Sequence, residues 1–261
     1  MRLTRFQWII AATLLAAALI VVTCSGAWCL LWLSLLFSIS GTCVGLGVSF
    51  PQWQLFGKCL CRVQTNQKLV ALTFDDGPDP DSTPALLDLL ARRNIRATFF
   101  CIGERVARQP ELARRIAAEG HSIENHSHRH QFWTNLLAEE KLEADLAQAQ
   151  EEIRRVSGRT PAWFRPPMGL TNPRVFRVTR KLGLRMAGYT ARGLDLRADG
   201  PERIVARLRR GLRPGAILLL HDGGVPAARL TATVTALMDM LQTEGYHCVR
   251  LDELVSNETK S

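Results

Sequence analysis

Two adjacent carboxylates are the residues in this sequence best suited to chemistry. Asp75 and Asp76 follow the apolar residues 69–74 and precede Gly77-Pro78, so we expect them where a buried strand gives way to a turn. Side chains of consecutive residues at a strand end diverge, so one carboxylate can bind a metal ion while its neighbour stays free as a general base. A metal-assisted hydrolase requires this division of labour.

A pair of histidines can complete such a site. His126 and His130 are four residues apart, so one turn of helix or loop places both imidazoles on one face. With Asp76 they would supply three ligands and leave open positions for water and substrate. This N/O set suits zinc, and cobalt, nickel, manganese and iron are also compatible. Taken separately, Asp-Asp-Gly-Pro is typical of a turn and His-x-x-x-His of a structural pair, so the combination carries the prediction.

The elements that would position these residues alternate along the chain. Short apolar runs predict strands at 69–74, 97–101, 122–125, 162–165, 184–189, 216–220 and 247–251. Longer helical patterns lie between them at 84–93, 110–119, 136–156, 174–182, 201–212 and 230–244. Alternation of this kind indicates an α/β fold with parallel strands and crossover helices.

Four motifs resemble the polysaccharide deacetylase family, also known as carbohydrate esterase family 4 or the nodulation-deacetylase (NodB) homology domain. They are LTFDDGP at 72–78, HSHRH at 126–130, FRPPMG at 164–169 and LLLHD at 218–222, and they occur in the family's order. The resemblance covers about residues 68–255. It implies an irregular (β/α)7 barrel with its active site at the C-terminal ends of the strands.

The resemblance also implies a role for each matching residue. Asp75 would be the general base, and Asp76, His126 and His130 would bind the metal. Arg165 would orient the base, and the backbone amide of Met168 would help to hold the oxyanion. His221 would protonate the departing amine, and Leu219 would line the pocket for the acyl methyl group.

The sequence departs from the family pattern at three positions. Met168 stands where Tyr or Phe is usual, Arg192 occupies the first position of an Asp-x-x-Asp-Trp arrangement, and Leu196 replaces its tryptophan. Asp195 is retained as the second acid. These changes leave open which group polarises His221 and whether the substrate is an ordinary glycan. An arginine at the mouth of the site could bind a phosphate or a carboxylate.

The first quarter of the chain indicates a membrane anchor. Residues 6–57 contain no Asp, Glu, Lys or Arg, which is long enough for two crossings of about 20 residues each. We predict a two-helix hairpin with spans at 6–22 and 27–48. The anchor would comprise residues 1–57, followed by a linker at 58–67, the catalytic domain at 68–256 and a tail at 257–261. A signal peptide is the competing interpretation, but its apolar core would be shorter.

The flanking charges favour one side of the membrane. Arg2 and Arg5 precede the first span and Lys58 and Arg62 follow the second, with no charge between the spans. The positive-inside rule therefore predicts a protein of the bacterial inner membrane with both ends, and the catalytic domain, in the cytoplasm. Many relatives act on extracytoplasmic glycans, and a single crossing would place the domain outside.

The leading functional prediction is a metal-dependent hydrolase that removes N-acetyl or a similar small acyl group from an amino sugar of a glycan. The alternatives are a deacylase or deformylase of a lipid-linked amino sugar, and a catalytically silent carbohydrate-binding membrane protein. The net charge of +9 would suit membrane lipid. No nucleic-acid motif accompanies this charge, so a nucleic-acid partner is not predicted.

Overall fold

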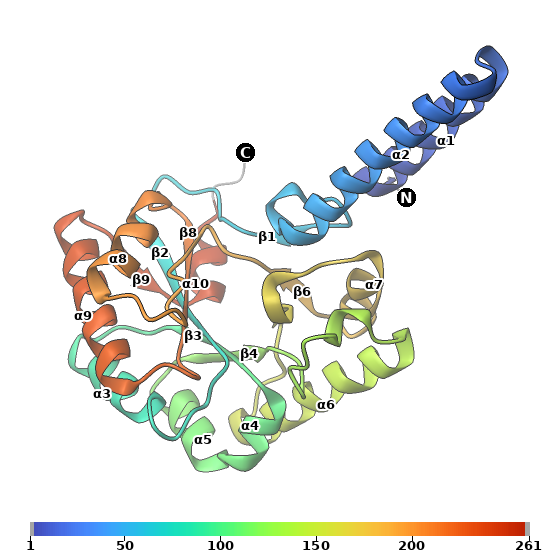
Figure 1. The fold of residues 1–261 in the computed structure, drawn as a ribbon. Coiled ribbons are helices and arrows are strands. Elements are labelled where there is room, and N and C mark those ends of the chain that lie inside the picture. The colour runs from blue at the N-terminus through green and yellow to red at the C-terminus, as the bar shows by residue number, and fades with distance from the viewer. Residues whose placement is uncertain (1–2, 259–261) are drawn as a thin grey trace.

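The computed structural model describes residues 3–258 and combines a helical hairpin with a curled sheet of parallel strands (Figure 1). The predicted tail at 257–261 lies mostly outside the described residues.

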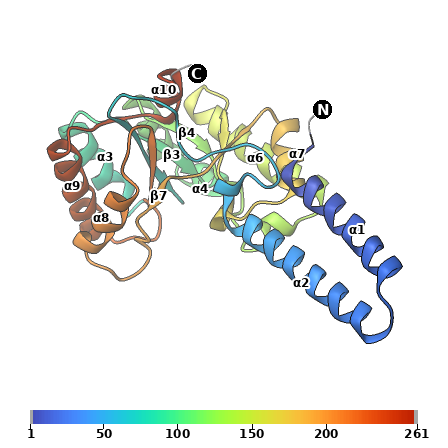
Figure 2. The same cartoon turned by 90° about the horizontal axis from the view of Figure 1, so that it is seen from above.

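The hairpin consists of α1 (Arg5–Thr23) and α2 (Gly26–Ser49), which lie side by side and project away from the sheet (Figures 1 and 2). A capping box between Thr4 and Gln7 begins α1, and Thr13 and Ser40 form a hydrogen bond of 2.8 Å between the helices. Both helices are long and apolar enough to cross a membrane, with mean hydropathies of 2.2 and 1.9. Both chain ends of the hairpin lie next to the catalytic domain, where Phe6 donates a backbone hydrogen bond to Leu55 and Val48 accepts one from Thr171 (Figure 2).

The sheet runs in the order β1-β6-β5-β4-β3-β2-β8-β7, and β9 also pairs with β2. All pairings between these strands are parallel. The strands are β1 (Cys59–Leu60), β2 (Leu69–Asp75), β3 (Thr98–Cys101), β4 (Ser122–Asn125), β5 (Trp163–Phe164), β6 (Arg185–Ala187), β7 (Ala191–Arg192), β8 (Ala216–His221) and β9 (His247–Val249). Because β1 and β7 do not pair with each other, the sheet is an open, irregular barrel, which confirms the predicted fold class.

Helices cover the outside of the sheet (Figure 1). They are α3 (Thr83–Arg92), α4 (Gly103–Arg108), α5 (Pro110–Ala118), α6 (Glu139–Ser157), α7 (Pro173–Lys181), α8 (Pro201–Arg210), α9 (Ala227–Thr243) and α10 (Leu251–Ser256), with short 3-10 turns η1 (Pro51–Trp53), η2 (Thr134–Leu136) and η3 (Pro167–Gly169). Prolines at the first turn and glycines just after the end delimit several of them, as expected from backbone geometry.

Two hydrophobic clusters follow from the alternation of side chains along β2. Leu72 and Phe74 face the outer helices, and the Phe74 ring stacks on Phe99 with centroids 5.2 Å apart. Ala71 faces the interior, where it belongs to a cluster with Phe100. Burial on both faces explains why β2 reads as a continuous apolar run.

The structure differs from the sequence-based prediction mainly in short elements. The strand predicted at 184–189 is limited to Arg185–Ala187 and is followed by a separate β7. The segment predicted as a linker at 58–67 contributes β1, which pairs with β6, and Val63 donates a backbone hydrogen bond to Gly215. These residues are therefore part of the folded sheet. Helix α4 was not predicted.

Candidate active site

Asp75 occupies the last position of β2 that faces the interior of the barrel. Side chains two residues apart share a face of a strand, so Ala71, Thr73 and Asp75 form a row. Thr73 donates a hydrogen bond to the Leu218 carbonyl, and Asp75 is buried at the strand's C-terminal end. The apolar strand thus carries a carboxylate to the edge where a barrel active site is usually found.

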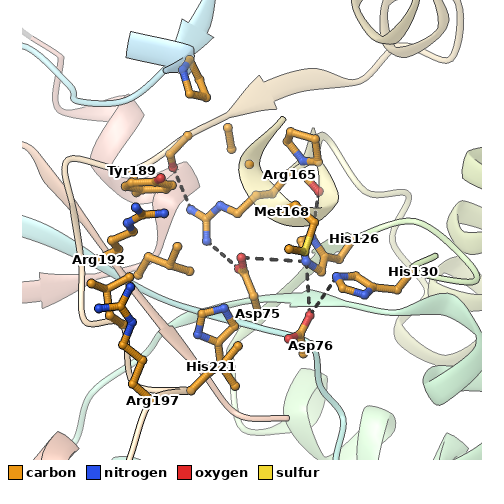
Figure 3. A pocket seen from close by; sticks show the side chains of 18 residues that line it. Asp75, Asp76, His126, His130, Arg165, Met168, Tyr189, Arg192, Arg197 and His221 are labelled. Carbon is orange, nitrogen blue, oxygen red and sulfur yellow. Dashed lines mark hydrogen bonds and ion pairs between the residues drawn. The ribbon is translucent and has the colours of Figure 1, made fainter. Parts of the chain in front are cut away.

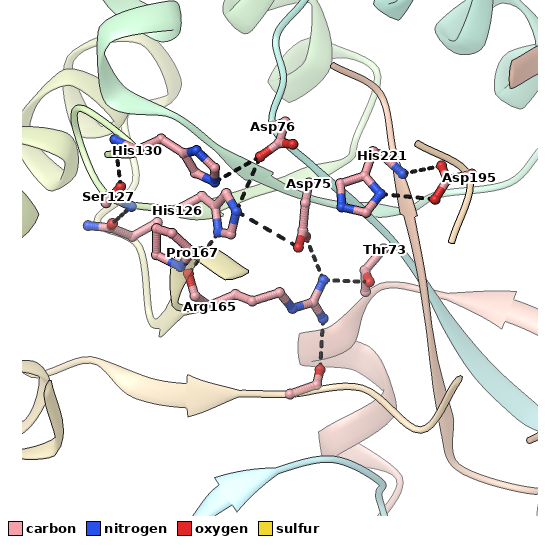
Figure 4. Close-up of polar contacts among 12 residues, drawn as sticks. Thr73, Asp75, Asp76, His126, Ser127, His130, Arg165, Pro167, Asp195 and His221 are labelled. Atoms are coloured by element: carbon pink, nitrogen blue, oxygen red, sulfur yellow. Dashed lines mark hydrogen bonds and ion pairs between the residues drawn. The ribbon is translucent and has the colours of Figure 1, made fainter. Parts of the chain in front are cut away.

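Arg165 fixes this carboxylate from the other side of the barrel (Figure 4). Its side chain is 2% exposed. One terminal nitrogen donates to Asp75 Oδ1 at 2.6 Å and to the Thr73 hydroxyl at 2.8 Å, and the other donates to the Gly188 carbonyl at 2.8 Å. The guanidinium also lies over the Phe100 ring. Arg165 therefore holds one oxygen of Asp75, and the other, Oδ2, lies 3.9 Å from Nε2 of His126.

Asp76 points toward the two predicted histidines rather than toward Arg165. Its φ of 73° turns the chain sharply after Asp75, so the two carboxylates diverge. Asp76 Oδ1 lies 3.3 Å from Nε2 of His126 and 3.2 Å from Nε2 of His130. Candidate ligand atoms from all three residues lie within 4.8 Å of one another.

A tight loop, not a helix, brings the histidines together. Ser127 and His130 have φ values of 66° and 50°. The Asn125 side-chain oxygen accepts a hydrogen bond from the Ser127 amide, and the His130 amide donates to the Ser127 hydroxyl. His128, between the two histidines, does not belong to the ligand group. Positive φ in such residues costs free energy and is concentrated at functional sites.

The geometry of this group fits a divalent metal ion. His126 Nδ1 lies 2.7 Å from the Arg165 carbonyl oxygen and can donate its proton there. The lone pair of Nε2 then faces Asp76 Oδ1, a buried atom with no hydrogen-bond partner. These two atoms repel each other unless positive charge lies between them. Donor atoms bound at about 2.0–2.2 Å to one ion lie about 3 Å apart, close to the separations found here.

Electrostatics point in the same direction. Burial disfavours the charged form of His126, but Asp75 and Asp76 outweigh that effect and raise its pKa. Burial likewise disfavours ionised Asp76, but its contacts with His126 and His130 hold the pKa of this carboxyl well below its usual value. The site therefore favours positive charge beside an ionised Asp76, a condition that a metal ion would satisfy.

His221 stands on the other side of Asp75 from the ligand group (Figure 4). Its Nδ1 lies 2.9 Å from Asp195 Oδ1, and its backbone amide donates to Asp195 Oδ2 at 2.8 Å. Burial alone would lower the pKa of His221. The hydrogen bond to Asp195 and the charge of Asp75 outweigh burial and raise the pKa to about 9. The partner of His221, which the sequence left open, is thus Asp195.

These groups line one pocket of about 280 Å³ (Figure 3). The metal-ligand group and Met168 lie on one side of it, while Arg192 and Arg197 lie on the other. The lining comprises Pro51, Asp75, Asp76, His126, His130, Arg165, Pro166, Met168, Gly169, Ala187, Gly188, Tyr189, Arg192, Leu194, Leu196, Arg197, Leu219 and His221. Every predicted site residue except Asp195 lines the pocket, and Asp195 reaches it through His221.

Gly77 is required by close packing below the site. A Cβ atom at this position would lie 2.1 Å from Asp222 Oδ2. Asp222 is fully buried and accepts a hydrogen bond from the Thr83 hydroxyl at 2.7 Å. The Asp-Asp-Gly-Pro turn is therefore clamped by the residue that follows His221.

Comparisons with known proteins agree with this geometry. The family model described as polysaccharide deacetylase matches residues 62–187. A peptidoglycan-N-acetylglucosamine deacetylase of Bacillus cereus is 37% identical over 196 residues, which are 74% of this chain and 91% of that protein. The chain belongs to the polysaccharide deacetylase family. The relatives of this chain include deacetylases of N-acetylglucosamine in peptidoglycan, which are amide hydrolases, and the chain is an enzyme of the deacetylase class.

Two further members of the family are similar to this chain, one in sequence and one in sequence and structure. A chitooligosaccharide deacetylase of Bradyrhizobium sp. is 36% identical over 197 residues, covering 71% of this chain and 90% of that protein. The structure of a family 4 acetyl xylan esterase from Clostridium thermocellum in complex with a cobalt ion is 34% identical, with a TM-score of 0.66 over 72% of this chain and 90% of that one.

Within the deacetylase fold, the three sequence departures all lie in the pocket. Met168 has a φ of 59° and an exposed side chain. The Arg192 guanidinium lies over the Tyr189 ring, 5.9 Å from its centroid, and Leu196 is exposed. Tyr189, Arg197 and Pro51 were not predicted as pocket residues, because segments far apart in the chain bring them there.

Proposed function

We propose that this deacetylase removes N-acetyl groups from amino sugars with the help of one divalent metal ion, zinc in the first instance. The observation that carries the proposal is the position of Asp75. It lies between the Asp76–His126–His130 group and His221, so a base and an acid flank the place where an amide carbonyl would be attacked.

The residues divide the chemistry as follows. Asp75, oriented by the hydrogen bond from Arg165, takes a proton from the attacking water through Oδ2. The backbone amide of Met168 donates a hydrogen bond to the oxyanion. His221, protonated and oriented by Asp195, donates its proton to the nitrogen as the carbon–nitrogen bond breaks. Leu219 lines the pocket for the acyl methyl group.

The metal would be held by Asp76, His126 and His130. When bound, a divalent ion supplies Lewis-acid chemistry that favours ionisation of water and polarises the amide carbonyl. The nitrogen and carboxylate donors fit zinc, cobalt, nickel, manganese or iron.

The test is metal content and acetate release by the purified full-length protein in detergent, with chitooligosaccharides as substrate. His126→Ala with His130→Ala should lose stoichiometric metal and activity. Asp75→Asn should keep the metal and lose most activity, because an amide cannot accept the proton. His247→Ala, at an exposed histidine on β9, is the matched control. Metal-loaded protein without activity on any acylated amino sugar would favour the silent carbohydrate-binding alternative.

We further propose that α1 and α2 anchor the enzyme in the bacterial inner membrane as a two-span hairpin. Their length and apolar surface support this, as does the position of both hairpin ends beside the catalytic domain. With Arg5 and Lys58 at these ends and no charge in the turn, the positive-inside rule favours a cytoplasmic domain. Reporters active on only one side, each fused after Ser261, test the orientation. Activity of the external reporter alone would reverse it.

A lipid-linked amino sugar is the second candidate substrate. Two observations favour it. Pro51, two residues after α2, lines the pocket, and Arg192 and Arg197 in the pocket wall form no ion pair with a carboxylate within residues 3–258. Paired guanidinium groups suit a phosphate. Replacing both arginines by glutamine should raise KM for a polyprenyl-phosphate-linked substrate and leave KM for chitooligosaccharides unchanged. Equal effects on both substrates would remove the candidate.

A further inference from the structure

Large exposed apolar side chains of the catalytic domain come from a few short segments. Among the described residues that follow α2, those exposed are Phe50, Trp53, Phe132, Trp133, Leu136, Met168 and Leu196. Met168 and Leu196 line the pocket, and Trp53 lies in η1, directly after the hairpin. Exposed apolar side chains gathered in one region of a domain mark an interaction surface. We call Phe132, Trp133 and Leu136 the apolar rim.

The loop that carries the apolar rim is inverted relative to an ordinary surface loop. Its polar residues Thr134 and Asn135 are 1% and 3% exposed, whereas Phe132, Trp133 and Leu136 are 71%, 56% and 77% exposed. A loop in water normally buries its apolar side chains and exposes its polar ones. This loop presents its apolar side chains outward instead.

The inversion is built by specific hydrogen bonds. The Asn135 side-chain amide donates to the Pro167 carbonyl at 3.0 Å, and the backbone carbonyl of Asn135 accepts from the Asn172 side chain at 2.6 Å. The Thr134 hydroxyl donates to the Gln131 carbonyl. These contacts fix the polar residues inward, so the backbone holds the apolar rim outward.

The same contacts connect the apolar rim to the base of the hairpin. The Thr171 amide donates to the Val48 carbonyl at 3.1 Å, and Val48 belongs to the last turn of α2. Asn172, the next residue, binds Asn135 in the rim loop. One short chain of hydrogen bonds thus runs from the end of a membrane-length helix to the rim. The rim loop is thus linked to the last turn of α2 through residues 171 and 172.

Positive charge accompanies the apolar rim. Arg174 of α7 donates to the carbonyl oxygens of Leu136 and Leu137 at 3.1 and 2.5 Å. Further along α7, Arg180 lines a hollow together with Lys58 and with Phe6 of α1, and Arg177 in the same hollow is paired with Glu139 at 2.8 Å. Cations beside exposed aromatic rings are the usual composition of a surface in contact with anionic lipid headgroups.

We infer that the apolar rim enters the headgroup layer of the membrane that the hairpin spans, so the partner of this surface is a lipid bilayer containing anionic lipid. The inference rests on the proposed anchoring of α1 and α2. The hairpin and the rim then give the domain two separate attachments to one membrane. These attachments fix its tilt and hold the pocket, with Pro51, Met168 and Leu196 in its lining, against the lipid surface.

The test measures contact of the rim with lipid in the full-length protein, reconstituted into vesicles of phosphatidylcholine and phosphatidylglycerol. An environment-sensitive fluorescent amino acid replaces Phe132 in one sample. In the matched control it replaces Gln242, an exposed residue of α9 on the side of the domain away from the hairpin (Figure 1). Lipids that carry a quencher near the headgroup should reduce emission from position 132 several-fold more than emission from position 242.

Equal quenching at the two positions would overturn the inference, and so would failure of the protein to float with the vesicles. A second measurement uses Trp133→Ser combined with Leu136→Ser, which should reduce quenching at position 132 while the protein still floats. Unchanged quenching in this variant would also count against the rim. None of these measurements needs turnover or bound metal, so their outcome is separate from that of the proposed deacetylation.

Discussion

Replacing Asp195 by asparagine should move the alkaline limb of the deacetylation rate to lower pH. A general acid must be protonated to act, so the rate falls as pH rises through the pKa of His221. Asp195 contacts this histidine twice, at Nδ1 and at the backbone amide. In the variant the asparagine oxygen can still accept from the backbone amide. Its NH2 group would then face Nδ1 and disfavour the imidazolium.

The size of the shift follows from the lost interaction. A hydrogen bond to a charged group contributes about 1.5–3 kcal/mol, and one pKa unit corresponds to about 1.4 kcal/mol. Losing the contact should therefore lower the pKa of His221 by about 1–2 units from its value of about 9. With a pKa of about 7, about one tenth of the histidine is protonated at pH 8, so the rate there should fall about tenfold. A bound metal ion would lower the pKa of His221 in both proteins. The prediction therefore concerns the difference in pH between their alkaline limbs.

The assay is kcat/KM for acetate release across the pH range, at constant metal occupancy. Asp239→Asn is the matched control, because Asp239 is half-exposed on α9 and pairs only with Arg93 at 2.9 Å among the described residues. It should leave the limb in place. If kcat/KM of a folded, metal-loaded Asp195→Asn protein falls at the same pH as that of the unchanged protein, the reasoning is refuted. A uniform loss of rate without a shift would mean that Asp195 orients His221 but does not set its pKa.

The parts of the site that could be predicted from the sequence lie at the ends of long, apolar strands. Asp75 and His221 end β2 and β8, which pair in parallel along their length. Because the carboxyl ends of adjacent parallel strands meet at one edge, two motifs about 145 residues apart were expected to converge. Burial on both faces made these strands visible as continuous apolar runs. The roles given to their terminal residues stay predictions until variants are measured.

Other parts depend on tertiary contacts that leave little trace in the sequence. Strands β1 and β7 are two residues long, too short for any periodicity, and they exist because a neighbouring strand offers hydrogen bonds. The segment that follows β7 places Asp195 in contact with His221. The inverted rim loop was also missed, since outward Phe132 and Trp133 look like core residues in a pattern of hydrophobicity. Only the buried Asn135 in the structure shows that they face outward.

Three further variants test the structure behind the site. Arg165→Lys should keep bound metal but lower kcat by about 30–100-fold. Lysine cannot replace the several hydrogen bonds of the guanidinium, which together are worth about 2–3 kcal/mol. Near-normal turnover would contradict this positioning role. Burial lowers the pKa of His121 to about 4, so the unfolded chain binds a proton before the folded chain does. The free energy of unfolding should therefore fall by about 3 kcal/mol as pH drops from about 6.5 to about 4, and urea titrations should show a smaller loss in His121→Asn. Gly215 has a φ of 76°, and a Cβ there would lie 1.9 Å from the Val63 carbonyl oxygen. Gly215→Ala should thus lower the melting temperature far more than Gly183→Ala, where φ is 72° but no atom lies within 4 Å. Equal losses in these two proteins would show that backbone strain alone, and not the contact with residue 63, requires glycine at position 215.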